Sequence, residues 1–222
     1  MRTEEARAIC QMVLSLALPA GSVCLNLGSS TKTLREKKQP HIQNELLGPM
    51  SKAGLLVIHC DAKADEGVDL VGDVLDTAYQ RILQGQGARL LLCSNMLEHL
   101  ADPRSFALAC SSLVPRGGYA IVSVPLSYPY HPDPIDTMLR PTPETIATYF
   151  PGWSLVRGHI VTSTSFLQDS LAKENGYLRL AEYMGKLLLP FYKARSWKRR
   201  AHRAMWLFRP YLISIAMLRK DS

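Results

Sequence analysis

The stretch Ser22–Thr31 constrains the fold of this chain more than any other part of the sequence. Val23–Leu27 is a short apolar run with one polar interruption at Asn26, which is typical of a strand buried on both faces of a parallel sheet. Gly28 and two small serines then end this strand abruptly. Ligands of open α/β sheets bind beyond the carboxyl ends of strands, and a glycine lets them approach the backbone. The turn therefore predicts a ligand site; a strand followed by an ordinary turn is the alternative.

Apolar runs and helical patterns alternate through the rest of the chain. After the first strand, we expect strands at Leu55–Cys60, Val68–Gly72, Ala88–Cys93, Tyr119–Val124, Trp153–Thr162 and Tyr211–Leu218. We expect helices at Ile9–Leu18, Thr77–Leu83, Phe106–Leu113 and Thr142–Phe150, the last with Thr142 as its N-cap. Thr31–Met50 is polar and is expected to be irregular. The alternation predicts βαβ units and a mostly parallel sheet.

The segment between the last two expected strands is too long for a simple connection. Ser163–Arg209 exceeds the usual length of a loop, so we predict a helical insertion there. The length of 222 residues suits one domain, and we expect residues 1–222 to form it, with 163–209 as a basic cap.

The formal net charge of +7 is concentrated near the end of the sequence. Ten Lys and Arg residues and no acid lie between Lys186 and Lys220, whereas the other residues have a net charge of −3. Aromatic and apolar side chains interleave with these bases over 186–209. Three interpretations remain open: a lid whose charges face water, a peripheral contact with an anionic membrane or phosphate-bearing substrate, and nucleic-acid binding, which we favour least.

The cysteines and the apolar runs bear on the expected compartment. Five cysteines form no CxxC pair and no metal-ligand spacing, and we expect Cys24, Cys60 and Cys93 to be buried hydrophobes in a reducing compartment. No run reaches the ~18 apolar residues that a membrane span needs. We therefore expect a cytoplasmic protein, with peripheral contact at the inner face of the membrane as an open alternative.

Five short motifs, taken in their order, resemble those of class I S-adenosylmethionine-dependent methyltransferases. Leu25–Ser30 is similar to the glycine turn of the first motif in that family. Asp61 and Gly72–Asp73 resemble the acids that follow its second and third strands. Asn95–Pro103 resembles its fourth-strand exit, and Leu113–Gly118 resembles the Leu-x-Pro-Gly-Gly turn before its fifth strand. This order covers at least Gly21–Pro125.

The resemblance implies a fold, a cofactor and a set of cofactor residues. The fold would be a doubly wound, Rossmann-like α/β sheet of seven strands, with an antiparallel last strand and the helical insertion before it. The cofactor would be S-adenosyl-L-methionine, with Asp61 on the ribose and Asp73 on the adenine amino group; a capping role is the alternative for Asp61. The expected cofactor-binding residues are Asn26, Gly28, Ser29, Ser30, Asp61, Asp73, Asn95 and Met96. Asn26 replaces the usual acid of the first motif, and Ser30 replaces its second glycine.

The acceptor side is expected after the fourth and fifth strands. Four prolines between Pro125 and Pro134 stiffen a loop that carries His131, and we expect His131 to be the base because alcohol acceptors need one within hydrogen-bond reach. A structural crossing loop whose histidine caps a helix is the alternative. The expected substrate residues are Glu98, His99, Tyr130, Asp133, Asp136 and Arg140. Because His131, Asp133 and Asp136 lack a recognised metal spacing, no metal site is expected.

Two functions remain open at this point. The first is methyl transfer from S-adenosyl-L-methionine to a small-molecule, sugar or lipid-linked acceptor. The second is a non-catalytic binding module of the same fold, which would use its basic cap to hold a membrane or an anionic partner.

Overall fold

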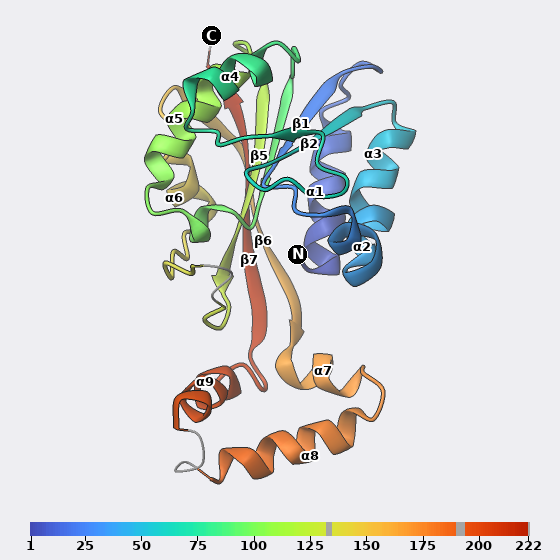
Figure 1. Ribbon diagram of the computed structural model, residues 1–222, viewed down its shortest axis with the longest axis vertical. Coiled ribbons are helices and arrows are strands. Elements are labelled where there is room, and N and C mark those ends of the chain that lie inside the picture. Colours follow the sequence, from blue (N-terminus) through green and yellow to red (C-terminus); the bar gives the residue numbers. More distant parts are fainter. Residues whose placement is uncertain (132–134, 190–193, 222) are drawn as a thin grey trace.

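A seven-stranded sheet forms the centre of the protein (Figure 1). The computed structural model describes residues 1–131, 135–189 and 194–221. The strands lie in the order β3-β2-β1-β4-β5-β7-β6. They are β1 (Val23–Leu27), β2 (Leu56–Asp61), β3 (Leu70–Val71), β4 (Leu90–Ser94), β5 (Tyr119–Ser127), β6 (Trp153–Ser165) and β7 (Pro210–Lys220). β1 to β5 pair in parallel, and β7 runs antiparallel to both β5 and β6. The predicted mostly parallel sheet with an antiparallel last strand is confirmed.

The register of the parallel strands places their carboxyl ends side by side. Leu27, the last residue of β1, pairs with Cys60 of β2 and with Cys93 of β4. The residues that follow these strands are therefore neighbours at one edge of the sheet, although they are far apart in the sequence. All of β4 from Leu90 to Cys93 is buried, as expected for a central parallel strand.

Helices cover both faces of the sheet, which makes it doubly wound (Figure 1). On one face, α1 (Thr3–Ser15) packs a buried stripe that includes Ile9 and Val13. On the other, α4 (Thr77–Gln84), α5 (Pro103–Leu113) and α6 (Pro143–Ala147) contribute to a second cluster. Thr142 is the N-cap of α6, as predicted, and its hydroxyl accepts a hydrogen bond from the Thr145 N–H.

The segment expected to be irregular is helical, and that prediction is wrong. It contains two π-helical turns, η1 (Leu34–Lys38) and η2 (Gln43–Leu47), together with α2 (Pro40–Ile42) and α3 (Gly48–Lys52). Four apolar residues recur at helical spacing among its polar ones and are buried in the cluster that also contains α1: Ile42, Leu46, Leu47 and Met50. The polar composition hid this short apolar stripe.

A helical cap, defined here as α7 (Phe166–Leu171), α8 (Gly176–Leu187) and α9 (Ala194–Ala204), lies between β6 and β7. These two strands extend beyond the others and carry the cap away from the rest of the sheet (Figure 1). Its own core is small and consists of Phe166, Trp206 and Tyr211, with Tyr128, Tyr183 and Leu207 packed against them. The Arg2 guanidinium binds both carboxylate oxygens of Asp169, which ties the cap to the start of α1.

All five cysteines are free and buried, as predicted for Cys24, Cys60 and Cys93. Burial raises the pKa of the Cys24 thiol well above its usual range, so this side chain behaves as a small apolar group. Among the described residues, no helix has the length and apolar character required to cross a bilayer.

Replacing Leu46 tests the helical packing of the segment after β1. Leu46 is 1% exposed, so Leu46→Ala is expected to lower the free energy of unfolding by about 2–5 kcal/mol through lost burial and a cavity. Leu14→Ala is the control, because Leu14 of α1 is 44% exposed and its loss should cost only about 0.5 kcal/mol. Urea denaturation measures both; equal small losses would show that this segment does not pack on α1.

Candidate active site

The turn after β1 has the sharp geometry that the sequence predicts. Gly28 has a φ of +67°, and Ser30 follows with a φ of +55°. The Ser29 N–H donates to the Cys60 carbonyl at 3.0 Å, which holds the turn against the end of β2. A Cβ at Gly28 would lie 3.0 Å from Met96 Sδ, so Met96 from the β4 exit packs directly over the glycine. Both the backbone angle and this contact favour glycine here.

Asp61 is the last residue of β2 and Asp73 follows β3, so both acids lie at the carboxyl ends of their strands. Asp61 Oδ2 accepts from the Ser30 N–H at 2.8 Å, and its Oδ1 accepts from the Lys63 N–H at 3.1 Å. Asp73 is exposed, and its Oδ1 accepts from the Leu75 N–H at 2.9 Å. A carboxylate offers about four acceptor positions. Asp61 therefore braces the β1 turn and keeps acceptor positions for a ligand hydroxyl.

Arg35 holds the same turn, and nothing in the sequence pointed to it. This side chain is 4% exposed, and its guanidinium donates to the carbonyls of Ser29, Ser30 and Gly67 at 2.6–2.9 Å. Burial lowers its pKa, and the nearby charge of Asp69 opposes that shift. Arg35 thus joins the loops after β1 and β2, and it brings a positive charge to the corner where the ligand site is expected.

Asn26 and His59 form a pair between β1 and β2. Asn26 is buried, and its Nδ2 lies 3.1 Å from His59 Nδ1. Burial, followed by the Arg35 charge, lowers the pKa of His59 to about 4, whereas Asp69 raises it. A neutral imidazole that accepts at Nδ1 from the Asn26 amide satisfies both groups. The Asn26 amide is therefore engaged by His59 within the sheet.

Glu5 brings α1 into the site. Its Oε1 accepts from the Asn95 side-chain amide at 2.8 Å and from the Ser123 hydroxyl at 2.7 Å, so one buried carboxylate connects the exit of β4 to the middle of β5. Asn95 has a φ of +52°. Sequence reasoning missed Glu5, although it lies four and seven residues before Ile9 and Met12 and so shares their buried face.

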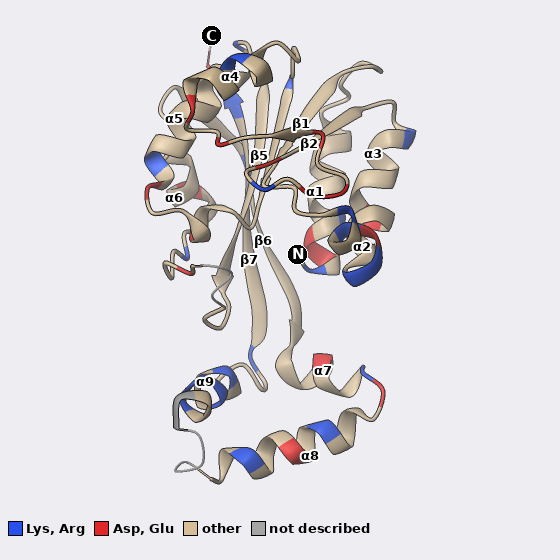
Figure 2. Cartoon of the chain, viewed as in Figure 1, with Lys and Arg blue, Asp and Glu red and all other residues tan. Residues whose placement is uncertain are grey.

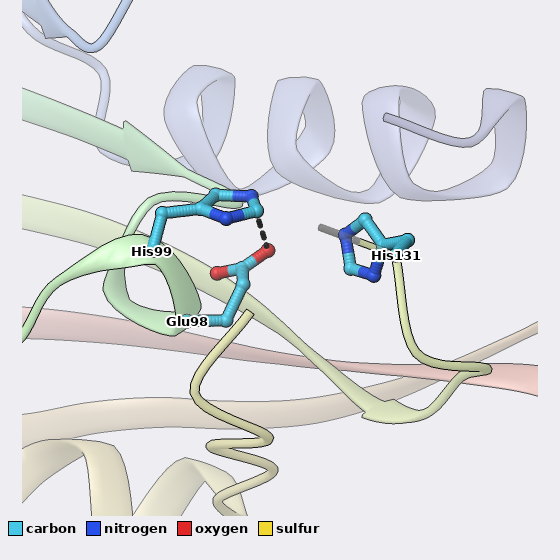
Figure 3. A group of neighbouring side chains, drawn as sticks. All are labelled: Glu98, His99 and His131. Atoms are coloured by element: carbon cyan, nitrogen blue, oxygen red, sulfur yellow. Dashed lines mark ion pairs between the residues drawn. The ribbon is translucent and has the colours of Figure 1, made fainter. Parts of the chain in front are cut away.

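A second group of side chains forms where η3 (Leu97–His99) meets the loop after β5. Glu98, His99 and His131 bring one ligand-type atom each to within 4.8 Å of one another (Figure 3). Glu98 has no exposed surface, and neither carboxylate oxygen has a hydrogen-bond partner among the described residues. Desolvation raises the pKa of Glu98 to about 8; the charges of Glu5 and Asp136 add to this shift, and Arg140 opposes it.

Hydrogen bonds orient the two histidines. His99 Nδ1 contacts the Ile135 carbonyl, and its Nε2 lies 3.8 Å from Glu98 Oε1. His131 Nδ1 lies 3.2 Å from Asp136 Oδ2, while the His131 N–H donates to that same oxygen at 3.0 Å. Burial lowers the pKa of His131, and the Asp136 charge acts against this. Nδ1 also lies 3.3 Å from the Pro129 carbonyl, so it faces two oxygens, and Nε2 of His131 is the nitrogen left for chemistry.

Asp136 is held in turn by Arg140. The two terminal guanidinium nitrogens of Arg140 donate to Asp136, at 2.7 and 3.0 Å. Although burial opposes it, hydrogen bonds from Arg140 and from the N–H groups of His131 and Met138 hold the pKa of Asp136 far below its usual range. Asp136 is thus a charged, rigid support for His131.

Carboxylate and imidazole groups can also bind a divalent cation. Three ligand atoms at about 2.1 Å from an ion lie no more than about 4.2 Å from one another. The ligand-type atoms of this group lie within 4.8 Å of one another, so the side chains would have to move closer together to bind an ion. The expectation of no metal was made from the spacing of His131, Asp133 and Asp136, and Asp133 lies outside the described residues.

The remaining predicted substrate residue, Tyr130, points to the cap. It is 45% exposed, and its N–H donates to His202 Nε2 of α9 at 3.1 Å. Together with Lys198 and Arg199, these two residues line a surface cavity of about 180 Å³. The structure therefore gathers Glu98, His99, His131, Asp136 and Arg140 in one place and sets Tyr130 apart, at the boundary with the cap.

Solved structures with the same fold span several chemistries. Coclaurine N-methyltransferase bound to N-methylheliamine and SAH aligns with 96% of this chain and 70% of its own, at 13% identity and a TM-score of 0.55. A candidate sarcosine dimethylglycine methyltransferase from Galdieria sulphuraria aligns with 99% and 84%, at 12% identity and a TM-score of 0.56. The [4+2]-cyclase SpnF aligns with 97% and 81%, at 12% identity and a TM-score of 0.53.

This likeness establishes that the chain has the class I methyltransferase fold, which also includes a cyclase. By sequence, no protein-family model and no curated protein matches the chain.

The half-buried His59 predicts acid sensitivity of the fold. Its pKa is about 4 in the folded chain and about 6.5 in an unfolded one, so the unfolded chain binds more protons between these values. The free energy of unfolding should therefore fall as the pH drops from about 6.5 to 4. Urea denaturation over this range measures it, with His59→Gln as the comparison. The variant should lose less stability in the same window; equal slopes would mean that His59 is protonated freely in the folded chain.

Proposed function

We propose that this chain is an S-adenosyl-L-methionine-dependent methyltransferase that acts on a hydroxyl group of a small-molecule acceptor. The observation that carries the proposal is the presence of two groups at the same edge of the sheet. One is the Gly28 turn with Asp61 and Asp73, and the other is the Glu98–His99–His131 group. The first suits a nucleoside, and the second suits proton transfer. Coclaurine N-methyltransferase, which has the same fold, was crystallised with SAH.

The residues of the first group fit the cofactor in their chemistry. Asp61 and Asp73 supply carboxylate acceptors for ribose hydroxyls and the adenine amino group, and Asp61 is already oriented by the Ser30 N–H. Gly28 is exposed and has no side chain, so a ligand can approach its backbone beside Met96, which packs on one side of the glycine. The proposed cofactor residues remain Asn26, Gly28, Ser29, Ser30, Asp61, Asp73, Asn95 and Met96, with the Asn26 amide acting through His59. When bound, S-adenosyl-L-methionine supplies a methyl group on a sulfonium, which is the electrophile.

The second group activates the acceptor. Burial keeps His131 neutral, and Asp136 directs its Nδ1, so Nε2 accepts the proton of an acceptor hydroxyl. The carboxylate of Asp136 then stabilises the charged imidazole, as an orienting acid does beside a catalytic histidine. Burial raises the pKa of Glu98 to about 8, which favours its neutral form, so it adds no second negative charge to that of Asp136 near His131.

The acceptor class follows from the surroundings of this group. The proposed substrate residues are Glu98, His99, Tyr130, Asp133, Asp136 and Arg140, with Asp136 and Arg140 acting as positioning residues. A sugar hydroxyl, including one on a lipid-linked glycan, suits a site that combines polar groups with the aromatic ring of Tyr128, which lies 5.1 Å from the His131 ring. A non-catalytic module is the alternative, and cofactor titration separates the two.

Replacing Gly28 tests the cofactor site. Gly28→Ala adds a Cβ at 3.0 Å from Met96 Sδ, so the affinity for S-adenosylhomocysteine should fall on the order of tenfold in isothermal titration. Gly87→Ala is the matched control: Gly87 has a similar φ of +63°, but its Cβ would meet no atom within 4 Å. Both variants bear similar backbone strain of about 1–2 kcal/mol. Wild-type protein that shows no binding at millimolar ligand would favour the non-catalytic module.

Replacing His131 tests the base. His131→Asn should reduce transfer of a tritiated methyl group into a polar small-molecule extract by about 100-fold or more, and leave the S-adenosylhomocysteine affinity unchanged. His159→Asn is the control and should retain activity, because His159 is an exposed residue of β6. Equal transfer by the His131 variant and the wild type would remove His131 from the mechanism.

The same assay separates a base from a metal ligand at His131. If Nε2 accepts the proton directly, treatment with EDTA leaves methyl transfer unchanged. If EDTA abolishes transfer and Zn²⁺ restores it, Glu98, His99 and His131 hold a cation, and the proposed base is wrong.

A further inference from the structure

The segment that contains the helical cap holds the whole net charge of the protein. Residues 163–209 contain ten Lys and Arg against three Asp and Glu, so their net charge of +7 equals that of the whole chain. Basic side chains lie on α8 and are dense on α9, at the end of the molecule remote from α4 (Figure 2). Of these, Lys186, Lys198, Arg199 and Arg203 are exposed. The cap is therefore a cationic surface carried on an otherwise neutral body.

The same cap exposes large apolar side chains. Tyr177, Leu178 and Leu188 are 72–80% exposed, and Phe208 is 78% exposed. Along α8 and its C-terminal end, the exposed apolar residues recur at helical spacing, so they form one stripe: Tyr177, Leu178, Met184, Leu188 and Leu189. Single exposed apolar residues are ordinary, but three on α8 followed by two directly after its end indicate a surface that contacts something apolar.

The fold of the cap does not use this stripe. α8 packs inward through Tyr183, whose ring lies 4.9 Å from that of Phe166 and whose hydroxyl donates to the Arg200 carbonyl at 2.6 Å. The buried core of the cap consists of Phe166, Trp206 and Tyr211, and the residues packed on it include none of the stripe. Within the part of the chain that the structure describes, the stripe thus faces away from the protein.

We propose that the cap binds the surface of an anionic membrane. A helix with an apolar face beside basic residues lies in the interface of a bilayer, with its apolar face among the acyl chains and its cations at the lipid head groups. The stripe of α8 together with Phe208 supplies the apolar part, and α9 supplies the cations. The proposed contact is peripheral, because the apolar stripe and the cations lie at the surface of the cap.

Charge distinguishes this partner from a second copy of the chain. A symmetric dimer through the cap would place one surface of net charge +7 against another, and such repulsion costs affinity. Anionic lipids instead gain about 1 kcal/mol for each Lys or Arg close to the surface, which is about fivefold in affinity. The apolar stripe and the cations are satisfied together only by a surface that is both apolar and negative.

The location of the cap connects the membrane to the candidate active site. Tyr130, next to His131, donates its N–H to His202 of α9, and both residues line the basic cavity with Lys198 and Arg199. A bilayer under the cap would bring an acceptor carried on a lipid close to His131. This last consequence rests on the proposed methyl transfer, whereas membrane binding itself does not.

Vesicle sedimentation tests the proposal with the full chain. Wild-type protein should sediment with vesicles that contain phosphatidylglycerol and remain in solution with phosphatidylcholine alone, and binding should weaken as salt is added. Leu178→Ser combined with Leu188→Ser should reduce the vesicle affinity at least tenfold, on the order of the transfer of two large apolar side chains. Lys198→Gln combined with Arg199→Gln should reduce it about 25-fold, from about fivefold for each charge.

A matched variant and a second readout keep the test decisive. Leu108→Ser on α5 is the control, because Leu108 is 57% exposed outside the cap and its loss should leave vesicle binding unchanged. Each variant should retain the wild-type circular dichroism and S-adenosylhomocysteine affinity, measured without vesicles, so loss of lipid binding is distinguished from failure of the cofactor site. Absence of sedimentation with anionic vesicles would overturn the proposal. So would a dimer in light scattering that the Leu178/Leu188 variant abolishes, since that would identify a second copy as the partner.

Discussion

The parallel pairing of β1 with β2 and β4 is the constraint on which the candidate site depends. Because Leu27 pairs with Cys60 and Cys93, the chain leaves three neighbouring strands along one line. Gly28, Asp61 and the β4 exit therefore meet, although they are up to about 70 residues apart in the sequence. A shift of one residue in this register would turn every side chain of β1 to the other face and would separate these groups.

A buried carboxyl group without a partner marks the second part of the site. An unsatisfied buried polar group lowers the free energy of unfolding by about 1–3 kcal/mol. Glu98 therefore destabilises the fold at its position. Arg140 lies close enough to influence Glu98 but gives its hydrogen bonds to Asp136 instead. This arrangement stabilises the charged carboxylate of Asp136, which orients His131, and leaves Glu98 without a hydrogen bond. A buried polar group without a partner is expected where it functions in ligand binding rather than in stability.

The sequence predicted the sheet well because its signals are local. Strand residues such as Val23–Leu27 and Leu90–Cys93 are apolar runs, and the N-cap at Thr142 depends on residues next to it. Contacts between distant residues were not predictable. The pairing of Glu5 with Asn95 spans 90 positions, and Arg35 reaches Gly67 across 32. His131 was singled out as the base from its loop, but its position beside His99 and Glu98 depends on how that loop returns to η3.

The central claim is that an adenosyl group binds at the Gly28 turn and forms hydrogen bonds with Asp61 at the end of β2 and Asp73 after β3. A crystal structure of the protein with S-adenosylhomocysteine tests it most directly. The account predicts the ribose hydroxyls within hydrogen-bond distance of Asp61, the adenine amino group at Asp73 and Met96 beside the ligand. Density for the ligand at another site, with Arg35 and Asp61 alone filling the corner after β1, would contradict it.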